Sequence, residues 1–463
     1  MSITPFTVIL ILFYIRLLLI SDLKMRFMLS FVMTMICTIV IYMGYFVSFE
    51  SGSTIPYSTV SWLFCTFFAY GLNRQPSEKE IEVELVRKKI IFYLLCIIIT
   101  ILCFYFHRYD KEVIMDSDYE NYLLGYGAFS HLDSSSFKYG FVYISIMFCY
   151  VIYTMNKYLE KEDILFIGSR FVKYSLASVF VGYVEFFTEN IFESLMVTNL
   201  TISFFGESGA QQAILTFDRG WSNIQGFTKE ASMYSTSLFY STVVALNMII
   251  LTGKERQYYL YLIAVFFLLL LNSSMSSYVY AFLIMIFVVF LKPFSEEDQV
   301  QTNPKLAMYL IFGAFLLLFG SQAVLLSSET YLATRLNESF LQFENFGGQE
   351  FTYSSEAVRY FGIDHCLSIF VDRPLFGVGF GCVTCVSGIV TLLTNIGIFG
   401  LAAYVLLIKP IFHINRGDML FVLFLLVIAS NLLLNDLNTM FALVIPFTVY
   451  MTIISIQSRS MEY

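Results

Sequence analysis

The chain has 463 residues, of which 58% are hydrophobic and only 13% are charged, and its mean hydropathy is +0.72. Soluble globular domains carry about 25% charged residues, so this composition excludes an ordinary soluble domain. The net charge of -8 also disfavours a nucleic-acid partner, because nucleic-acid phosphates bind to basic surfaces.

Apolar runs close to 20 residues long recur from one end of the chain to the other, and a helix needs about that length to cross a bilayer. A transmembrane β-barrel would instead show alternating segments of about 10 residues. We therefore predict an all-α, polytopic membrane protein with a single integral membrane domain over 1–463. The predicted spans, thirteen within a range of 12–14, are 3–20, 27–47, 57–73, 90–106, 139–155, 171–190, 232–251, 257–271, 276–291, 306–325, 386–408, 419–434 and 438–456.

The basic residues predict which side of the membrane each loop faces. One alternating set of loops holds 18 of the 27 Lys and Arg residues, and the opposite set holds 8. Because basic loops stay in the cytoplasm, the N-terminus is expected outside and the C-terminus inside. Three long polar loops, at about 107–138, 191–231 and 326–385, then lie outside, and loops of such length are often functional.

The last of these loops carries the most informative pattern, RYFGIDHCLSIFVDRPLFGVGFG, which begins at Arg359. The pattern includes Arg373, and Arg335 precedes it in the same loop. A fourth arginine, Arg219, lies in the loop at 191–231 within FDRGWSNIQGF. Guanidinium groups recognise phosphates through paired hydrogen bonds, which predicts an anion site. Each arginine also fits a surface ion pair or a lipid headgroup contact, and that alternative stays open.

Three glycines follow Arg373, at Gly377, Gly379 and Gly381. Glycine permits close approach of the backbone, either to a ligand or to another helix. The run is not a P-loop, because no Gly-Lys-Ser/Thr follows it, and its spacing does not fit the dinucleotide-binding fingerprint.

Four residues are candidates for acid–base chemistry near the predicted outer boundary: Glu185, Glu230, Asp364 and His365. Glu185 lies inside a predicted span, where a carboxyl group is costly and often functional. A carboxylate or histidine could deprotonate an attacking hydroxyl group. Each of them also fits a structural role. No metal and no cofactor is expected, since the chain has only four His residues and no H-x-x-H spacing.

The segment VDRPLFGVGFG, with Arg359 upstream and LLTNIGIFGLAAY downstream, resembles the O-antigen polymerase (Wzy) family, within the superfamily that also includes the O-antigen ligases. NIQGFTKEASMYS resembles the shorter family segment in which a Gly and an acidic residue precede a central span. The resemblance implies a GT-C-like membrane glycosyltransferase in the bacterial inner membrane, with its active site facing the periplasm.

The resemblance further implies the substrates and the roles of the residues. Oligosaccharide repeat units linked to undecaprenyl diphosphate would be polymerised into a surface polysaccharide such as O-antigen, and the four arginines would hold the diphosphate. The lipid bilayer and a chain-length regulator would be the partners, without nucleic acid. The ligase branch carries a histidine just beyond the glycine motif, where this chain has Cys382, Val383, Thr384 and Cys385, so a polymerase is favoured.

A flippase or other transporter of lipid-linked oligosaccharides is the alternative from another class. Such a protein would line a central cavity with charged residues deep within its spans. Glu185 is the main charge of that kind in this chain, and most of the polar residues lie in the predicted outer loops.

Overall fold

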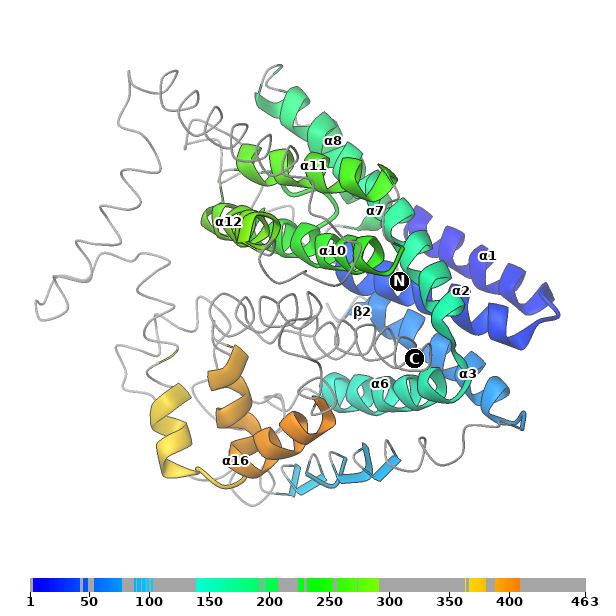
Figure 1. Ribbon diagram of the computed structural model, residues 1–463, viewed down its shortest axis with the longest axis vertical. Coiled ribbons are helices and arrows are strands. Elements are labelled where there is room, and N and C mark those ends of the chain that lie inside the picture. Colours follow the sequence, from blue (N-terminus) through cyan, green and yellow to red (C-terminus); the bar gives the residue numbers. More distant parts are fainter. Residues whose placement is uncertain are drawn as a thin grey trace, which may run out of the picture.

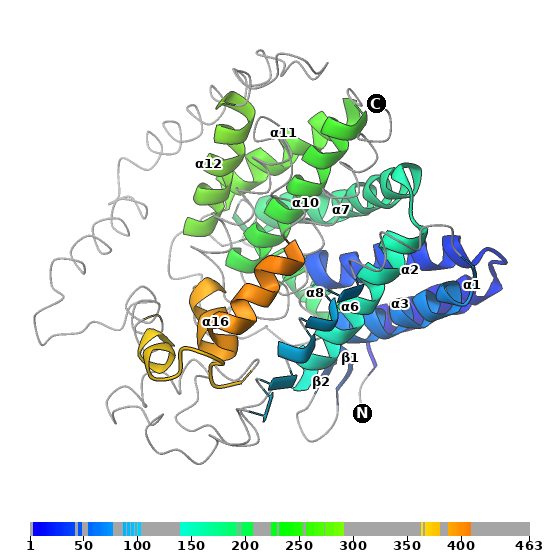
Figure 2. The same cartoon turned by 60° about the horizontal axis from the view of Figure 1, so that its bottom comes forward.

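The structure, a computed structural model, describes residues 3–41, 45–48, 54–76, parts of 87–102, 139–190, 192, 194, 196–206, 224–228, 231–252, 256–272, 274–290, 363, 366–379 and 388–408. Most of these residues are helical. Figures 1 and 2 show the helices from two directions. The elements are α1 (Pro5–Leu19), α2 (Leu23–Met35), the π-helical turn η1 (Ile36–Val40), β1 (Tyr45–Ser48), β2 (Thr54–Pro56), α3 (Tyr57–Asn73), α6 (Tyr139–Tyr158), α7 (Lys161–Asn190), α8 (Met196–Phe205), α10 (Ala231–Thr252), α11 (Arg256–Leu271), α12 (Met275–Phe290) and α16 (Gly388–Ile408).

Helices occupy most of each predicted span that the structure describes. Two helical stretches are long and apolar enough to cross a bilayer, Leu23–Val40 and Glu162–Glu189, and several shorter apolar helices accompany them. The count of thirteen spans stays a prediction, because the spans predicted at 306–325, 419–434 and 438–456 lie outside the described residues.

Two predicted boundaries were wrong. The span predicted at 27–47 ends at Val40, and the chain continues into an antiparallel hairpin in which β1 pairs with β2. The all-α prediction missed this hairpin, whose first strand is rich in the aromatic and β-branched residues that favour strands. Helix α7 begins at Lys161, ten residues before the predicted start, because acidic residues in its first turn favour a helix N-terminus.

Apart from the exposed Arg16 in its last turn, helix α1 exposes mainly apolar side chains. Leu10 and Tyr14 are buried against the other helices, while Leu12 and Leu19 are 60% and 81% exposed. A helix that is apolar all round over most of its length suits an environment that is apolar on both sides, with protein on one side and lipid on the other. Large exposed apolar side chains also occur on α3 and α7.

Small residues on α7 allow two neighbouring helices to approach it closely. A Cβ atom at Gly168 would collide with Met248 of α10, and one at Gly182 would collide with the Tyr234 hydroxyl of α10 and lie 2.9 Å from Leu268 of α11. Close packing at small residues is typical of helices in membranes, where contact rather than water exclusion drives association. Helices α7, α10, α11 and α12 accordingly form one group (Figure 1).

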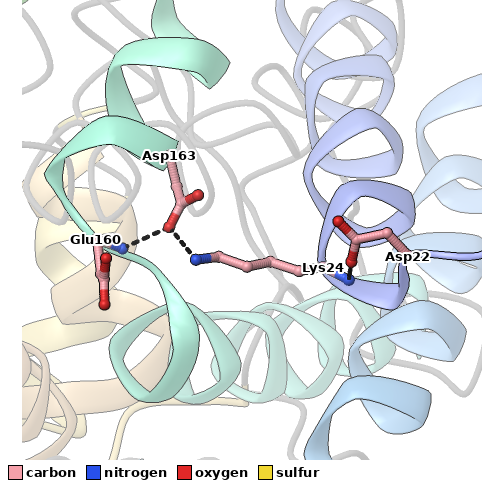
Figure 3. A network of polar contacts seen from close by, with 4 residues as sticks. All are labelled: Asp22, Lys24, Glu160 and Asp163. Carbon is pink, nitrogen blue, oxygen red and sulfur yellow. Dashed lines mark hydrogen bonds and ion pairs between the residues drawn. The ribbon is translucent and has the colours of Figure 1, made fainter.

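Polar contacts tie the ends of the helices together on two levels. At one level, the Tyr57 hydroxyl at the start of α3 donates to the Phe205 carbonyl at the end of α8, and the Thr7 hydroxyl donates to the Phe46 carbonyl. At the other level, Lys24 of α2 forms a 2.6 Å ion pair with Asp163 of α7 (Figure 3). The first group joins segments at the predicted outer ends of spans, and the second joins segments of predicted inner loops; which side faces the cytoplasm stays a prediction.

Candidate functional site

The glycine motif after Arg373 forms part of a break in α16. The backbone of this helix leaves the helical conformation at Gly397, where φ is 63° and ψ is -170°. This conformation is essentially restricted to glycine. Segment 374–379 packs against the break. We call segment 374–379 together with the broken part of α16 around Gly397 the α16 junction. The helical segment 366–372, which leads into the junction, lies beside α16 in Figures 1 and 2 (yellow and orange).

Backbone hydrogen bonds in the α16 junction replace those that the helix loses. In an unbroken helix the Ile398 N–H would donate to the Thr394 carbonyl four residues earlier. Instead, Thr394 accepts from the Val378 N–H at 3.0 Å, and Ile398 donates to the Pro374 carbonyl at 2.9 Å. The inserted segment therefore supplies both a donor and an acceptor in place of one helical bond.

The same exchange repeats one residue further along α16. The Gly379 N–H donates to the Asn395 carbonyl at 3.0 Å, and the Phe399 N–H donates to the Leu375 carbonyl at 3.2 Å. The rings of Phe376 and Phe399 stack at 5.2 Å over the same contact. Buried backbone groups must be paired, so the exchange lets the helix break without leaving orphaned groups.

Two glycines of the junction are required because the facing backbone lies too close for a side chain. A Cβ atom at Gly377 would collide with the Thr394 carbonyl oxygen and lie 2.5 Å from the Asn395 carbonyl carbon. A Cβ at Gly397 would collide with the Leu375 carbonyl oxygen. Both residues have positive φ, and so does Gly379. The sequence left two interpretations of Gly377, close approach to a ligand or to a helix. The structure shows the second, because the backbone at Gly377 packs against α16.

Arg373 caps the helical segment that leads into the junction. Its N–H donates to the Ile369 and Phe370 carbonyls, and its carbonyl accepts from the Gly377 N–H at 3.1 Å. The side chain is half-buried. The chain direction at Arg373 is thus fixed by the same turn that enters the break in α16.

A second irregular segment, 224–228, is held by the carboxyl group of Glu185. One carboxyl oxygen accepts from the Gln225 N–H at 2.8 Å, and the other accepts from the Gly226 N–H at 2.7 Å. Glu185 is 2% exposed. A carboxyl group whose two oxygens each receive a backbone donor is satisfied inside the protein, which explains how it can lie within an apolar helix. We call Glu185 with segment 224–228 the Glu185 clamp.

Tyr234 of α10 closes the other side of this segment. A Cβ at Gly226, where φ is 55°, would collide with the Tyr234 ring. The Tyr234 hydroxyl crosses to α7 and donates to the Ser178 carbonyl at 2.7 Å. The Thr228 hydroxyl donates to the Gln225 carbonyl at 2.8 Å and completes the turn. Segment 224–228 is thus enclosed between α7 and the first part of α10.

The first turn of α10 is also held from the opposite side. The Asn272 side chain, which follows α11, donates to the Ala231 carbonyl and to the Ser235 hydroxyl, both at 3.2 Å. The hydroxyl groups of Ser235 and Ser277 of α12 are hydrogen-bonded to each other. Asn272 and Ser277 are completely buried, so these contacts lie in the interior of the protein.

The structure describes some of the predicted site residues and not others. Glu185, Arg373, Gly377 and Gly379 are described, and they belong to the two regions above. The remaining predicted site residues, Arg219, Glu230, Arg335, Arg359, Asp364, His365 and Gly381, lie outside the described residues. Their roles and the convergence of the four arginines therefore stay predictions.

Sequence reasoning missed the residues that hold the backbone at these sites. Gln225, Tyr234 and Asn272 had no predicted role, although NIQGFTKEASMYS had been singled out as a segment. The signal that could have found them is a buried acidic residue in one apolar helix together with a glycine just before another.

No protein-family model matches the chain, and no curated protein matches it.

Proposed function

We propose that this chain is a polymerase of oligosaccharide repeat units of the Wzy type, and that it acts on undecaprenyl-diphosphate-linked substrates at the periplasmic face of the inner membrane. The single observation that carries the proposal is the α16 junction. The two sequence segments that resemble the family, VDRPLFGVGFG and LLTNIGIFGLAAY, pair with each other there through four backbone hydrogen bonds.

A broken helix is informative in an apolar protein. Irregular backbone at membrane depth is stable only when protein covers it or when it lines a cavity, and such breaks often mark binding sites. The break at Gly397 lies nine residues after the start of α16 at Gly388, and seven residues of helix before Asn395 span about 10 Å. The turn that carries Arg373 would therefore enter the membrane domain from the outer side.

The exposed apolar side chains of α1, α3 and α7 support the membrane part of the proposal. Burial of such surfaces by lipid removes an unfavourable contact with water. Thirteen spans and a GT-C-like arrangement belong to the same proposal.

The proposed reaction breaks the bond between the anomeric carbon of the growing chain and the diphosphate oxygen. A hydroxyl oxygen of the sugar on a second lipid forms the new bond to that carbon, and its proton passes to a base, for which Glu230, Asp364 and His365 are the candidates. The electron pair of the broken bond remains on undecaprenyl diphosphate. Arginines at Arg219, Arg335, Arg359 and Arg373 would stabilise this charge most as it develops.

The test uses the purified full-length protein in liposomes with a synthetic lipid-diphosphate repeat unit. The wild type is expected to form a ladder of longer lipid-linked products. Arg359→Ala is expected to lose the ladder while it still inserts and keeps its helical circular dichroism. Arg170→Ala, at an exposed position on α7 near the predicted inner side, is the matched control and is expected to keep the ladder. Normal polymer from Arg359→Ala would refute the role of this arginine.

The broken helix also favours a second candidate, a flippase or other transporter, because transporters use discontinuous helices. The same liposomes distinguish the two functions. A flippase would move the lipid-linked unit across the bilayer without lengthening the sugar chain, and a polymerase would lengthen it at one face. The O-antigen ligase alternative predicts a product on a different lipid acceptor and no ladder on the polyprenyl carrier.

A further inference from the structure

We infer that Glu185 is a positioning residue for the start of α10. The sequence alone made it a candidate acid or base. The structure gives both of its carboxyl oxygens to backbone donors, the Gln225 and Gly226 N–H groups at 2.8 and 2.7 Å. The inference rests on the proposed polymerase function, since it concerns how one part of that site is held.

Elements on both sides converge on the first turn of α10. From α7, Glu185 fixes segment 224–228, which is separated from the helix by two residues only. From the α11–α12 connection, Asn272 bonds the Ala231 carbonyl, and Ser277 bonds Ser235. Polar side chains from α7, from the α11–α12 connection and from α12 thus hold one helix start.

The position of this helix start in the chain gives it functional meaning. Ala231 is the first residue of α10, and the candidate base Glu230 immediately precedes it in the sequence. A base must be held in a narrow geometry to transfer a proton efficiently. Anchored backbone thus flanks Glu230 in the sequence on both sides, in segment 224–228 and in the first turn of α10.

The burial of Glu185 excludes direct contact with a sugar hydroxyl in this state. The side chain is 2% exposed, and Ile224 and Thr228 of the clamped segment are completely buried. Gly226 and Tyr234 pack too closely for a ligand to enter between them. Glu185 therefore acts on the reaction through the segment that it binds.

The first test compares Glu185→Gln with Glu162→Gln in the full-length protein in liposomes. Glu162 lies in the first turn of the same helix, α7, and is exposed, which makes it the matched control. The amide nitrogen that E185Q introduces cannot accept an N–H, so this variant loses one of the two clamp bonds. We expect kcat to fall by about 10- to 100-fold while KM changes by less than about twofold, because misplacement of a reacting group by about 1 Å can have this effect. E162Q is expected to keep kcat within about twofold of the wild type, because substitutions at exposed positions usually have small effects.

Hydrogen exchange provides a readout that does not depend on activity. E185Q is expected to raise the exchange of the Gln225 and Gly226 amides and of the first turn of α10, while α2 and α3 keep their protection. Loss of activity without a change in exchange would mean that Glu185 takes part in the chemistry, and it would overturn the inference. Faster exchange with unchanged kcat would overturn it too, because the clamp would then be purely structural.

A second pair of variants tests whether both anchors act on the same helix start. Asn272→Ala removes the donor to the Ala231 carbonyl. If Glu185 and Asn272 position one element, the kcat of the double variant falls by less than the product of the two single effects. Multiplicative effects would contradict a shared target. If the wild type forms no ladder at all, the proposed function fails, and exchange data on E185Q still show whether the clamp exists.

Discussion

The Glu185 clamp and the α16 junction both hold irregular backbone against apolar helices, but they use different groups. In the clamp, one carboxyl group accepts two N–H donors from segment 224–228. In the junction, segment 374–379 supplies two donors and two acceptors from its own backbone. A substitution at Glu185 removes a bond without introducing a collision, whereas the backbone exchange depends on contact distances that only glycine permits.

The two regions should therefore tolerate substitution differently. The clamp depends on the two acceptor oxygens of Glu185. A substitution that removes one of them therefore weakens the clamp in part. The α16 junction requires glycine at positions 377 and 397, because any Cβ atom there would collide with backbone atoms that cannot rotate away. We expect the junction to fail abruptly and the clamp to weaken gradually.

The largest expected effect is that of Gly397→Ala. The new Cβ would collide with the Leu375 carbonyl oxygen and would force a non-glycine residue into a backbone conformation that only glycine adopts. We expect the free energy of unfolding to fall by about 2–4 kcal/mol. Thermal unfolding of the protein in detergent, followed by circular dichroism, measures this loss.

Gly71→Ala in α3 is the control for Gly397→Ala. Its Cβ would meet only Leu23, at an ordinary distance of 3.9 Å, and its backbone is helical. Alanine favours a helix over glycine by roughly 0.5–1 kcal/mol, so this variant should be slightly more stable than the wild type. Equal stability of Gly397→Ala and the wild type would mean that α16 does not contain the exchange described above.

The apolar patterns predicted the helices well and the irregular segments poorly. Each span has its own periodicity or length signal, which depends only on neighbouring residues. The pairing of Val378 with Thr394 joins residues 16 positions apart through backbone atoms, and backbone atoms are the same in every sequence. The glycines marked the place of a close approach, but nothing in the sequence identified the partner.

The partners of Glu185 in the clamp could not be predicted from the sequence either. A carboxyl group in an apolar span is unusual enough to predict a role, and Glu185 was selected for that reason. Its partners lie 40 and 41 residues further along the chain. Because the partners contribute only N–H groups, no side-chain chemistry at Gln225 or Gly226 could indicate them.

A smaller effect is expected for Gly226→Ala in the clamp. The backbone has φ of 55°, and the Cβ would collide with the Tyr234 ring. A ring can shift, unlike a carbonyl group of a helix, so we expect a loss of about 1–3 kcal/mol. The measurement is again thermal unfolding in detergent.

A double-variant cycle separates the collision from the backbone strain in Gly226→Ala. Tyr234→Leu removes the ring that the Cβ would meet. If the collision contributes, Gly226→Ala costs less in the Tyr234→Leu background than in the wild type. An equal cost in both backgrounds would assign the whole effect to strain and would show that the ring does not enclose the segment.

The smallest expected effect is at the Lys24–Asp163 ion pair, which uses side chains on both sides (Figure 3). Lys24 is partly exposed, and exposed ion pairs contribute about 0–1 kcal/mol, so Lys24→Met should change the unfolding free energy by less than about 1 kcal/mol. Asp163→Ala should lower the unfolding free energy by about 1 kcal/mol more than Lys24→Met does. The reason is that the same Asp163 oxygen also accepts the Glu160 N–H, at 2.8 Å, at the start of α7. Thermal unfolding at low and high salt checks both values, and the effect of Lys24→Met should shrink with salt because screening weakens charge pairs near the surface. If Lys24→Met lowered the unfolding free energy as much as Gly226→Ala, the ranking of these effects would be wrong. That ranking assumes that backbone contacts in the interior contribute more than ion pairs between partly exposed side chains.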